Sequence, residues 1–163
     1  MQIEITAITE ADRQVIGDHV RELWGDELIL AHREAFHTTS LPGLKAVHNG
    51  KILGFLHYQL GKADCEILTL ASLIKRQGIG TALVEALEAM SRLSGCKRLM
   101  VTTTNDNLGA MAFYQHCGFS LSGVGLGLVD EARKQKPTLP EIGDHQIPIH
   151  DEIYLEKILA GQS

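Results

Sequence analysis

The junction at residues 75–81 constrains this chain more than any other part of the sequence. Residues 65–72 before it have the pattern of a mostly buried strand. After it, apolar residues recur at helical spacing: Ile79, Leu83, Ala86, Leu87, Met90 and Leu93. A helix start carries backbone N–H groups without internal partners, and its macrodipole favours negative charge. Because Gly78 and Gly80 permit close approach and Lys75 and Arg76 add positive charge, the junction predicts a phosphate or pyrophosphate site.

Two common phosphate-binding loops do not match this junction. A Walker loop ends in Gly-Lys-Ser/Thr, and that tripeptide does not occur in the chain. A dinucleotide-binding turn needs a third glycine or alanine where this chain has Leu83. A second glycine cluster at residues 123–127 also has its third glycine misplaced, and we interpret it as a flexible loop after a strand.

The junction instead resembles the acetyl-CoA loop of the GNAT superfamily of N-acetyltransferases. The matching residues are Lys75-x-x-Gly78-x-Gly80, with lysine in place of the usual arginine or glutamine and Ser72 in place of a proline. Residues 107–119 also match the family's Asn-x-x-Ala-x-x-Phe/Leu-Tyr-x-x-x-Gly-Phe pattern. The resemblance covers about residues 44 to 120. Residues 129–152 are similar to an extended tail of an uncharacterised branch of the family.

This resemblance implies a cofactor site and a fold. We expect a mixed, mostly antiparallel twisted sheet flanked by helices, in one domain over residues 1–163. The strands beside the loop should splay, since the pantetheine of acetyl-CoA pairs with backbone like an added strand. The implied cofactor-binding residues are Leu70, Ser72, Lys75, Arg76, Gln77, Gly78, Ile79, Gly80, Thr81, Asn107, Phe113 and Tyr114.

Two residues are catalytic candidates for direct transfer of an acetyl group to a primary amine. Tyr114 matches the family tyrosine near the CoA sulfur, and a phenol has a reference pKa near that of a thiol leaving group. Glu66 occupies the strand position where many family members carry a base, among apolar neighbours that would raise its pKa. The competing interpretations are a packed aromatic for Tyr114 and a solvent-facing or cation-paired carboxylate for Glu66. His145 or His150 is a weaker alternative base.

Composition agrees with a globular enzyme. The chain has 163 residues, 44% hydrophobic and 21% charged, with a net charge of −5, which argues against a nucleic-acid partner. No apolar run reaches the ~20 residues of a membrane span. Three unpaired cysteines and no signal-peptide pattern indicate a cytoplasmic protein. The histidine spacings match no zinc template, so we expect no metal. A homodimer is common for the fold.

Periodicity and turn residues predict the elements. The expected strands are residues 2–8, 44–48, 52–59, 65–70, 98–103, 119–124 and 153–159. The expected helices run from near Asp12 to Trp24, from the glycine loop to near Gly95, over 108–116, and over 130–136. Asn49-Gly50 predicts a hairpin turn, and residues 27–38 are ambiguous.

Two questions stay open at this level. Residues 129–151 contain Pro137, Pro140 and Pro148, and they either shape the acceptor site or form a surface flap or subunit contact. Trp24 either packs in the core or lines the acceptor site. The leading hypothesis is an acetyl-CoA-dependent N-acetyltransferase, and the alternative is a non-catalytic CoA-binding or interaction module on the same fold.

Overall fold

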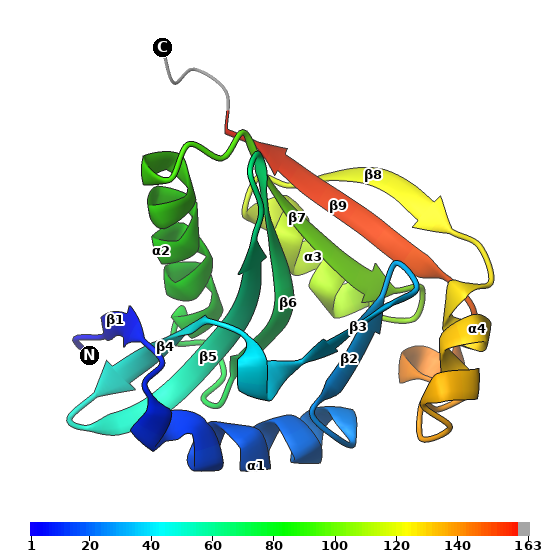
Figure 1. The fold of residues 1–163 in the computed structure, drawn as a ribbon, viewed down its shortest axis with the longest axis horizontal. Helices are drawn as coiled ribbons and strands as arrows, with labels where there is room; N and C mark the ends of the chain where they lie inside the picture. Colours follow the sequence, from blue (N-terminus) through cyan, green and yellow to red (C-terminus); the bar gives the residue numbers. More distant parts are fainter. Residues whose placement is uncertain (160–163) are drawn as a thin grey trace.

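The computed structural model describes residues 1–159, and a seven-stranded sheet organises this part of the chain (Figure 1). In chain order the strands are β1 (Glu4–Ala7), β2 (Leu28–Ala31), β3 (Glu34–His37), β4 (Gly43–His48), β5 (Lys51–Leu60), β6 (Asp64–Ser72), β7 (Arg98–Thr104), β8 (Ser120–Gly125) and β9 (Glu152–Ile158). The main sheet has the order β1-β4-β5-β6-β7-β9-β8, while β2 and β3 form a separate hairpin. Within the main sheet β6 and β7 are parallel and the other neighbours are antiparallel.

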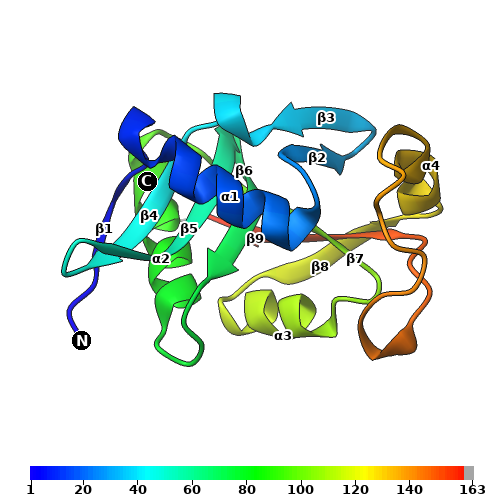
Figure 2. The ribbon, with the colours of Figure 1, turned by 90° about the horizontal axis from the view of Figure 1, so that it is seen from below.

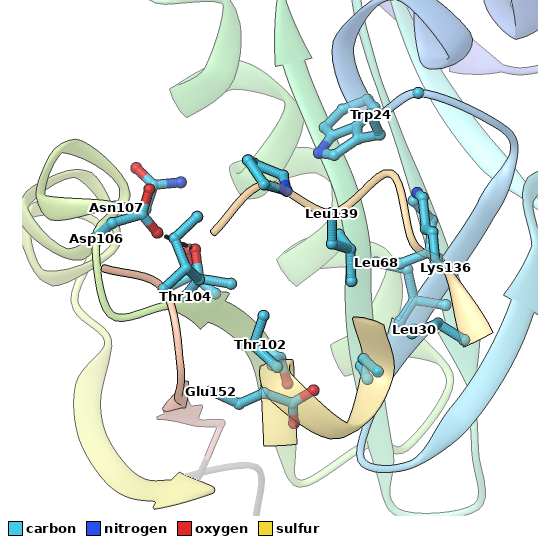
Figure 3. A pocket seen from close by; sticks show the side chains of 18 of the residues that line it. Trp24, Leu30, Leu68, Thr102, Thr104, Asp106, Asn107, Lys136, Leu139 and Glu152 are labelled. Carbon is cyan, nitrogen blue, oxygen red and sulfur yellow. Dashed lines mark hydrogen bonds between the residues drawn. The ribbon is translucent and has the colours of Figure 1, made fainter. Parts of the chain in front are cut away.

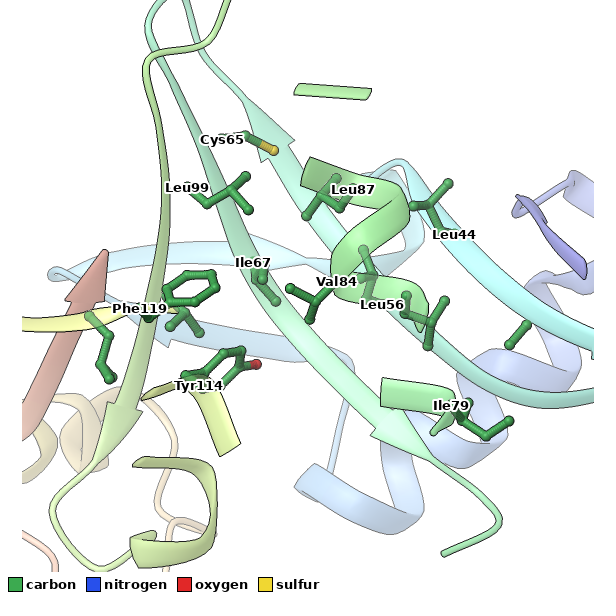
Figure 4. Close-up of a cluster of buried hydrophobic side chains, with 14 of the residues drawn as sticks. Leu44, Leu56, Cys65, Ile67, Ile79, Val84, Leu87, Leu99, Tyr114 and Phe119 are labelled. Carbon is green, nitrogen blue, oxygen red and sulfur yellow. The ribbon is translucent and has the colours of Figure 1, made fainter. Parts of the chain in front are cut away.

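Helices cover both faces of the sheet. They are α1 (Arg13–Trp24), α2 (Ile79–Leu93), α3 (Leu108–His116) and α4 (Leu128–Gln135). Figure 2 shows α3 on one side of the sheet and the β2–β3 hairpin on the other. Ile16 and Val20 of α1 pack with Phe55 on the hairpin side. The opposite side is filled by the main core cluster under α2 and α3 (Figure 4).

Alternation along β5 explains this two-sided core. Phe55 belongs to the cluster with α1, whereas its neighbour Leu56 belongs to the cluster under α2 and α3. Successive side chains of a strand point to opposite faces, so a strand covered on both faces is apolar at consecutive positions. Both side chains are fully buried. Full burial of each contributes about 1.5–3 kcal/mol to folding.

Local signals set the starts and turns of several elements. Asn49 and Gly50 have positive φ of 50° and 74°, as the tight β4–β5 turn requires. Asp12 accepts hydrogen bonds from the backbone N–H and the hydroxyl of Thr9, at 2.8 and 2.9 Å, which fixes the entry to α1. Gly118, with φ of 95°, follows α3 in the conformation that ends a helix.

The predicted elements are found, with shifts of at most two residues at their ends. The α/β fold class and its mostly antiparallel sheet are confirmed. One core prediction was wrong: Leu93, counted on the apolar face of the long helix, is 91% exposed. Leu93 is the last residue of α2 and lies off the buried face defined by Ile79, Leu83 and Leu87. The ambiguous residues 27–38 contain the β2–β3 hairpin, whose tip is His32-Arg33.

Cys65 and Cys96 are buried free thiols, and Cys117 is a half-buried one. Among residues 1–159, none of the helices has the length and apolarity needed to cross a bilayer.

Candidate active site

Strands β6 and β7 separate in the middle of the sheet. Their parallel pairing runs from Asp64 opposite Arg98 to Ile67 opposite Val101 and does not continue beyond. On its other side β6 has an irregularity, because His57 pairs with Thr69 while the next residue of β5 pairs with Ile67. The extra residue, Leu68, marks a bulge, and bulges bend a strand away from its neighbours. The ends of β6 and β7 therefore diverge, as the resemblance implied, and two cavities adjoin the divergence.

The first cavity has a volume of about 800 Å³ and lies between the end of β6 and the starts of α2 and α3. Its lining residues are Leu70, Ser72, Lys75, Arg76, Gly78, Ile79, Gly80, Thr81, Asn107, Gly109, Ala110, Phe113 and Tyr114. The structure thus brings together every cofactor residue expected from the sequence except Gln77. It adds Gly109 and Ala110 in the first turn of α3; Ala110 is the alanine of the matched motif, and neither residue was predicted to bind the cofactor.

The glycine loop has the geometry of an anion site. Gly78 precedes α2 with a left-handed φ of 72°, and no atom lies within 4 Å of the position that a Cβ would occupy. At Gly80 a Cβ would approach the Phe113 ring to 3.2 Å, so α2 and α3 meet closely there. The first amides of α2 have no partner within the helix and face the loop. Lys75 and Arg76 are both exposed beside it.

Asn107 caps α3 and lines both cavities. Its side-chain oxygen accepts a hydrogen bond of 3.0 Å from the Ala110 amide, so Asn107 is the N-cap of α3. Asn105 instead accepts hydrogen bonds from the His150 and Asp151 amides, both at 3.0 Å. Asp106 accepts one of 3.0 Å from the Asp144 amide. The residues that start α3 therefore also hold the segment before β9.

Tyr114 lies at the base of the first cavity. It is 5% exposed and packs edge-on against Phe113 and Phe119, with ring centroids 5.1 and 5.3 Å away (Figure 4). Burial raises the pKa of Tyr114 well above its usual value, with a smaller contribution from Cys117. A raised pKa keeps the phenol protonated at neutral pH but makes it a weaker acid than an unperturbed tyrosine, so burial moves its pKa away from that of a thiol leaving group.

Glu66 lies on β6 beside the tip of the β2–β3 hairpin. Its side chain is 13% exposed, and its Oε1 lies 3.2 Å from Nε2 of His32. Burial raises the pKa of Glu66, and the proximity of His32 partly opposes that rise. Glu66 lines neither cavity, but His32 Nε2 is also 3.0 Å from the hydroxyl of Thr102, which lines the second one. His32 and Thr102 thus connect Glu66 to that cavity.

His32 was not among the predicted site residues, in which His145 and His150 were the alternative histidines. His145 and His150 line neither cavity, and His150 pairs with Asp130 at 2.9 Å on the surface. His32 stacks on Tyr154 with ring centroids 4.7 Å apart. Its position at a hairpin tip could not be read from a segment whose secondary structure was ambiguous.

The second cavity, of about 430 Å³, lies on the other side of the divergence (Figure 3). Its apolar lining residues are Leu23, Trp24, Ile29, Leu30, Ala31, Ile67, Leu68, Val129, Ala132, Leu139, Pro140 and Ile149. Glycine and polar residues complete the lining: Gly25, Thr102, Thr103, Thr104, Asp106, Asn107, Lys136, Thr138 and Glu152. Trp24 therefore lines this cavity, and it also packs on Phe55 at a centroid distance of 6.5 Å.

The segment after β8 supplies one wall of the second cavity. Helix α4 is tied to the β2–β3 hairpin by Arg33 and Glu131, whose charged groups approach to 3.2 Å. At the other end of α4, the buried Lys136 donates a hydrogen bond of 2.8 Å to the Leu28 carbonyl and lies 3.2 Å from Asp26. These contacts hold residues 129–149 against the cavity.

Comparison with known proteins places the chain among the acetyltransferases. A family model described as the acetyltransferase (GNAT) family matches residues 6–119, and the chain belongs to this family. The Bacillus subtilis (strain 168) protein YdhI, described as uncharacterized, is 36% identical over 151 residues, which cover 92% of this chain and 94% of YdhI. The protein YxbD of the same organism, also described as uncharacterized, is 33% identical over 158 residues, or 96% and 99% of the two chains.

Solved structures agree on the fold. A crystal structure of a GNAT family acetyltransferase from Elizabethkingia anophelis with acetyl-CoA bound gives a TM-score of 0.71 at 23% identity, covering 96% of this chain and 98% of that one. The resemblance inferred from the two motifs is confirmed by these matches. Among residues 1–159, no three His, Cys, Asp or Glu side chains gather as metal ligands.

Proposed function

We propose that this protein transfers the acetyl group of acetyl-CoA directly to a primary amine. The observation that carries the proposal is the meeting of two cavities at Asn107, where β6 and β7 diverge. One cavity contains the glycine loop at the start of α2, and the other has a largely apolar lining. A donor and an acceptor bound from opposite sides would meet at the divergence, as direct transfer requires.

The donor would bind through backbone as much as through side chains. The amides at the start of α2 would bind the pyrophosphate, with Lys75 and Arg76 adding positive charge. Backbone groups near Leu70 and Ser72 are free of β7 and would pair with the pantetheine arm. The acetyl group would then lie near Asn107 and Tyr114.

The reaction needs one proton removed and one supplied. The amine nitrogen forms a bond to the acetyl carbonyl carbon, and the carbon–sulfur bond breaks with its electrons on sulfur. Tyr114 would donate its proton to the departing thiolate and regain one from solvent. The Thr102 hydroxyl would take the amine's proton while giving its own to Nε2 of His32, 3.0 Å away, and the same nitrogen would then pass that proton to Oε1 of Glu66, 3.2 Å away. The raised pKa of Glu66 suits a base that works near neutral pH.

A screen for CoA release tests this function. Purified protein, acetyl-CoA and a library of primary amines should yield free thiol above the no-amine background, with an acetylated amine detected by mass. The Tyr114→Phe protein, purified identically, is the control, since release by a contaminating enzyme would persist in it. If acetyl-CoA stabilises the fold but no amine is acetylated, the chain is instead a non-catalytic CoA-binding module.

A further inference from the structure

Glu152 is a buried carboxylate in the wall of the second cavity, the proposed acceptor cavity. It begins β9, is only 3% exposed, and lines the cavity next to the end of β2. Figure 3 shows its carboxylate beside Thr102, pointing toward the side of the cavity where Leu30 lies. A buried carboxylate is costly to a fold unless an opposite charge or several hydrogen bonds compensate for the lost hydration.

Neutral donors hold one side of this carboxylate. Glu152 Oε1 accepts hydrogen bonds from the His32 amide at 3.1 Å and from the Tyr154 hydroxyl at 2.9 Å. The described residues provide neither a hydrogen bond nor an ion pair to its other oxygen, Oε2, and no cation pairs with Glu152 at all. The side chain is therefore fixed in direction, and its negative charge lacks a counter-ion.

The other charged side chains that line this cavity are already engaged. Lys136 pairs with Asp26 and with a backbone carbonyl. Asp106 accepts hydrogen bonds from the Thr104 hydroxyl and the Asp144 amide. Within residues 1–159, Glu152 is thus the charged group of this lining that remains open to a ligand.

We propose that Glu152 binds the ammonium group of the acceptor, and that the acceptor is a small primary amine with an apolar body. The inference rests on the proposed function and names the substrate class of that site. Charge complementarity identifies the polar end of the substrate, because an ammonium group is the natural partner of an uncompensated buried carboxylate. The surrounding apolar residues, among them Trp24, Leu30 and Leu68, hold the hydrocarbon or aromatic body.

The same lining disfavours other amines. A diamine would set its second ammonium group against an apolar wall, and an α-amino acid would bring a carboxylate whose partner, Lys136, is already neutralised by Asp26. A volume of about 430 Å³ suits a small molecule rather than a folded protein substrate.

Two probes of similar size isolate the role of charge. 2-Phenylethylamine is protonated at neutral pH, whereas O-benzylhydroxylamine is largely neutral. Their binding to the CoA-saturated protein is measured by calorimetry, and their acetylation by CoA release from acetyl-CoA. The test variant is Glu152→Gln, which keeps the shape and can still accept the hydrogen bonds of His32 and Tyr154. The control is Glu156→Gln, on the same strand and with the same change in charge, because Glu156 pairs with Arg98 and lines neither the cofactor nor the acceptor cavity.

Glu152→Gln should weaken binding of 2-phenylethylamine by about 10- to 100-fold, the factor for one hydrogen bond to a charged group. In acetylation assays, Glu152→Gln should raise the KM for 2-phenylethylamine and change kcat little. Glu152→Gln should change the affinity for the neutral O-benzylhydroxylamine by less than about threefold. Glu156→Gln should change the affinity for 2-phenylethylamine by less than about threefold. If Glu152→Gln does not fold, the unaltered protein still decides: it should bind 2-phenylethylamine at least about tenfold more tightly than the neutral 2-phenylethanol.

Several results would overturn the inference. One is equal affinity of the unaltered and Glu152→Gln proteins for 2-phenylethylamine. Another is binding of 1,4-diaminobutane or phenylalanine that is tighter than binding of 2-phenylethylamine. A third is a fall in kcat of Glu152→Gln with unchanged affinity, which would assign Glu152 to proton transfer. Acetylation of other amines without dependence on Glu152 would leave the proposed function standing and remove this inference. Binding of 2-phenylethylamine that depends on Glu152, without acetylation of any amine, would support the binding site and remove the proposed function.

Discussion

Substituting Gly78 with aspartate is expected to separate cofactor binding from folding. Gly78 has a left-handed φ of 72° and open space around the position of a Cβ. Gly50, in the β4–β5 turn, has a φ of 74° and equally open surroundings, but it lines neither cavity. The two sites therefore impose a similar conformational penalty on any side chain, and they differ in whether an anion binds nearby.

Two energies decide the outcome: the backbone penalty, which both positions share, and the charge repulsion, which arises at Gly78 alone. A non-glycine residue in the left-handed region costs about 1–2 kcal/mol, and aspartate is among the better tolerated residues. A loss of about 1 kcal/mol lowers the Tm of a domain of this size by about 2–4 °C. At the loop, a carboxylate about 5 Å from a phosphate, at an effective dielectric constant of about 20 to 80, repels it by about 1–3 kcal/mol per charge. Acetyl-CoA binding should weaken by about 5- to 150-fold.

Calorimetric titration with acetyl-CoA and thermal unfolding of Gly78→Asp and Gly50→Asp measure both quantities. We expect similar losses of Tm in the two variants and a loss of acetyl-CoA affinity in Gly78→Asp alone. The alanine variants at the same positions lack the charge, and Gly78→Ala should retain most of the affinity. If Gly78→Asp bound acetyl-CoA as tightly as Gly50→Asp, the anion would not lie at the start of α2, and the assignment of the first cavity would be wrong.

Three further variants test the chemistry and the cavity wall. Tyr114→Phe should lower kcat by about 100-fold or more with little change in acetyl-CoA affinity, measured by steady-state kinetics and titration, because only the proton source is removed. The activity of the unaltered protein should rise with pH as Glu66 loses its proton. Because burial raises the pKa of Glu66, this rise should occur at a higher pH than the usual glutamate range. Glu66→Gln should lower turnover and flatten this limb of the pH–rate profile. Arg33→Gln should raise KM for the amine with little change in Tm, since Arg33 and Glu131 form a surface pair that joins the hairpin to α4, and adding Glu131→Gln should cause no further change.

The sequence predicted most of the fold because its local signals agree with each other. Apolar runs bounded by turn residues identified the central strands, and Asn49-Gly50 identified the turn between β4 and β5, with the backbone conformation that it requires. The β2–β3 hairpin escaped prediction for a physical reason. Its tip residues, His32 and Arg33, have φ of 55° and 65°, conformations usually filled by glycine or asparagine, so no turn signal was present.

The first and second cavities also differ in how far the sequence could predict them. The first cavity is lined by two short continuous segments, residues 70–81 and 107–114, so two linear motifs describe it almost completely. The acceptor cavity collects residues from α1, β2, the sheet and residues 129–152. The environment that suggests a role for Glu152 exists only because tertiary packing buries it beside Tyr154 and the His32 amide. A single glutamate at the start of a predicted strand has no sequence signature for that environment.

The tip of the β2–β3 hairpin links the two carboxylates of the site. His32 donates its backbone N–H to Glu152, while its ring lies against Glu66 and Thr102. A shift of the hairpin would therefore move the proposed amine anchor and the proposed base together. Since Arg33 of the same tip pairs with Glu131 of α4, a substrate that repositions α4 would also act on both carboxylates. If both proposed roles hold, acceptor selection and proton transfer are coupled through one turn, and that turn lies outside the two motifs that resemble the family.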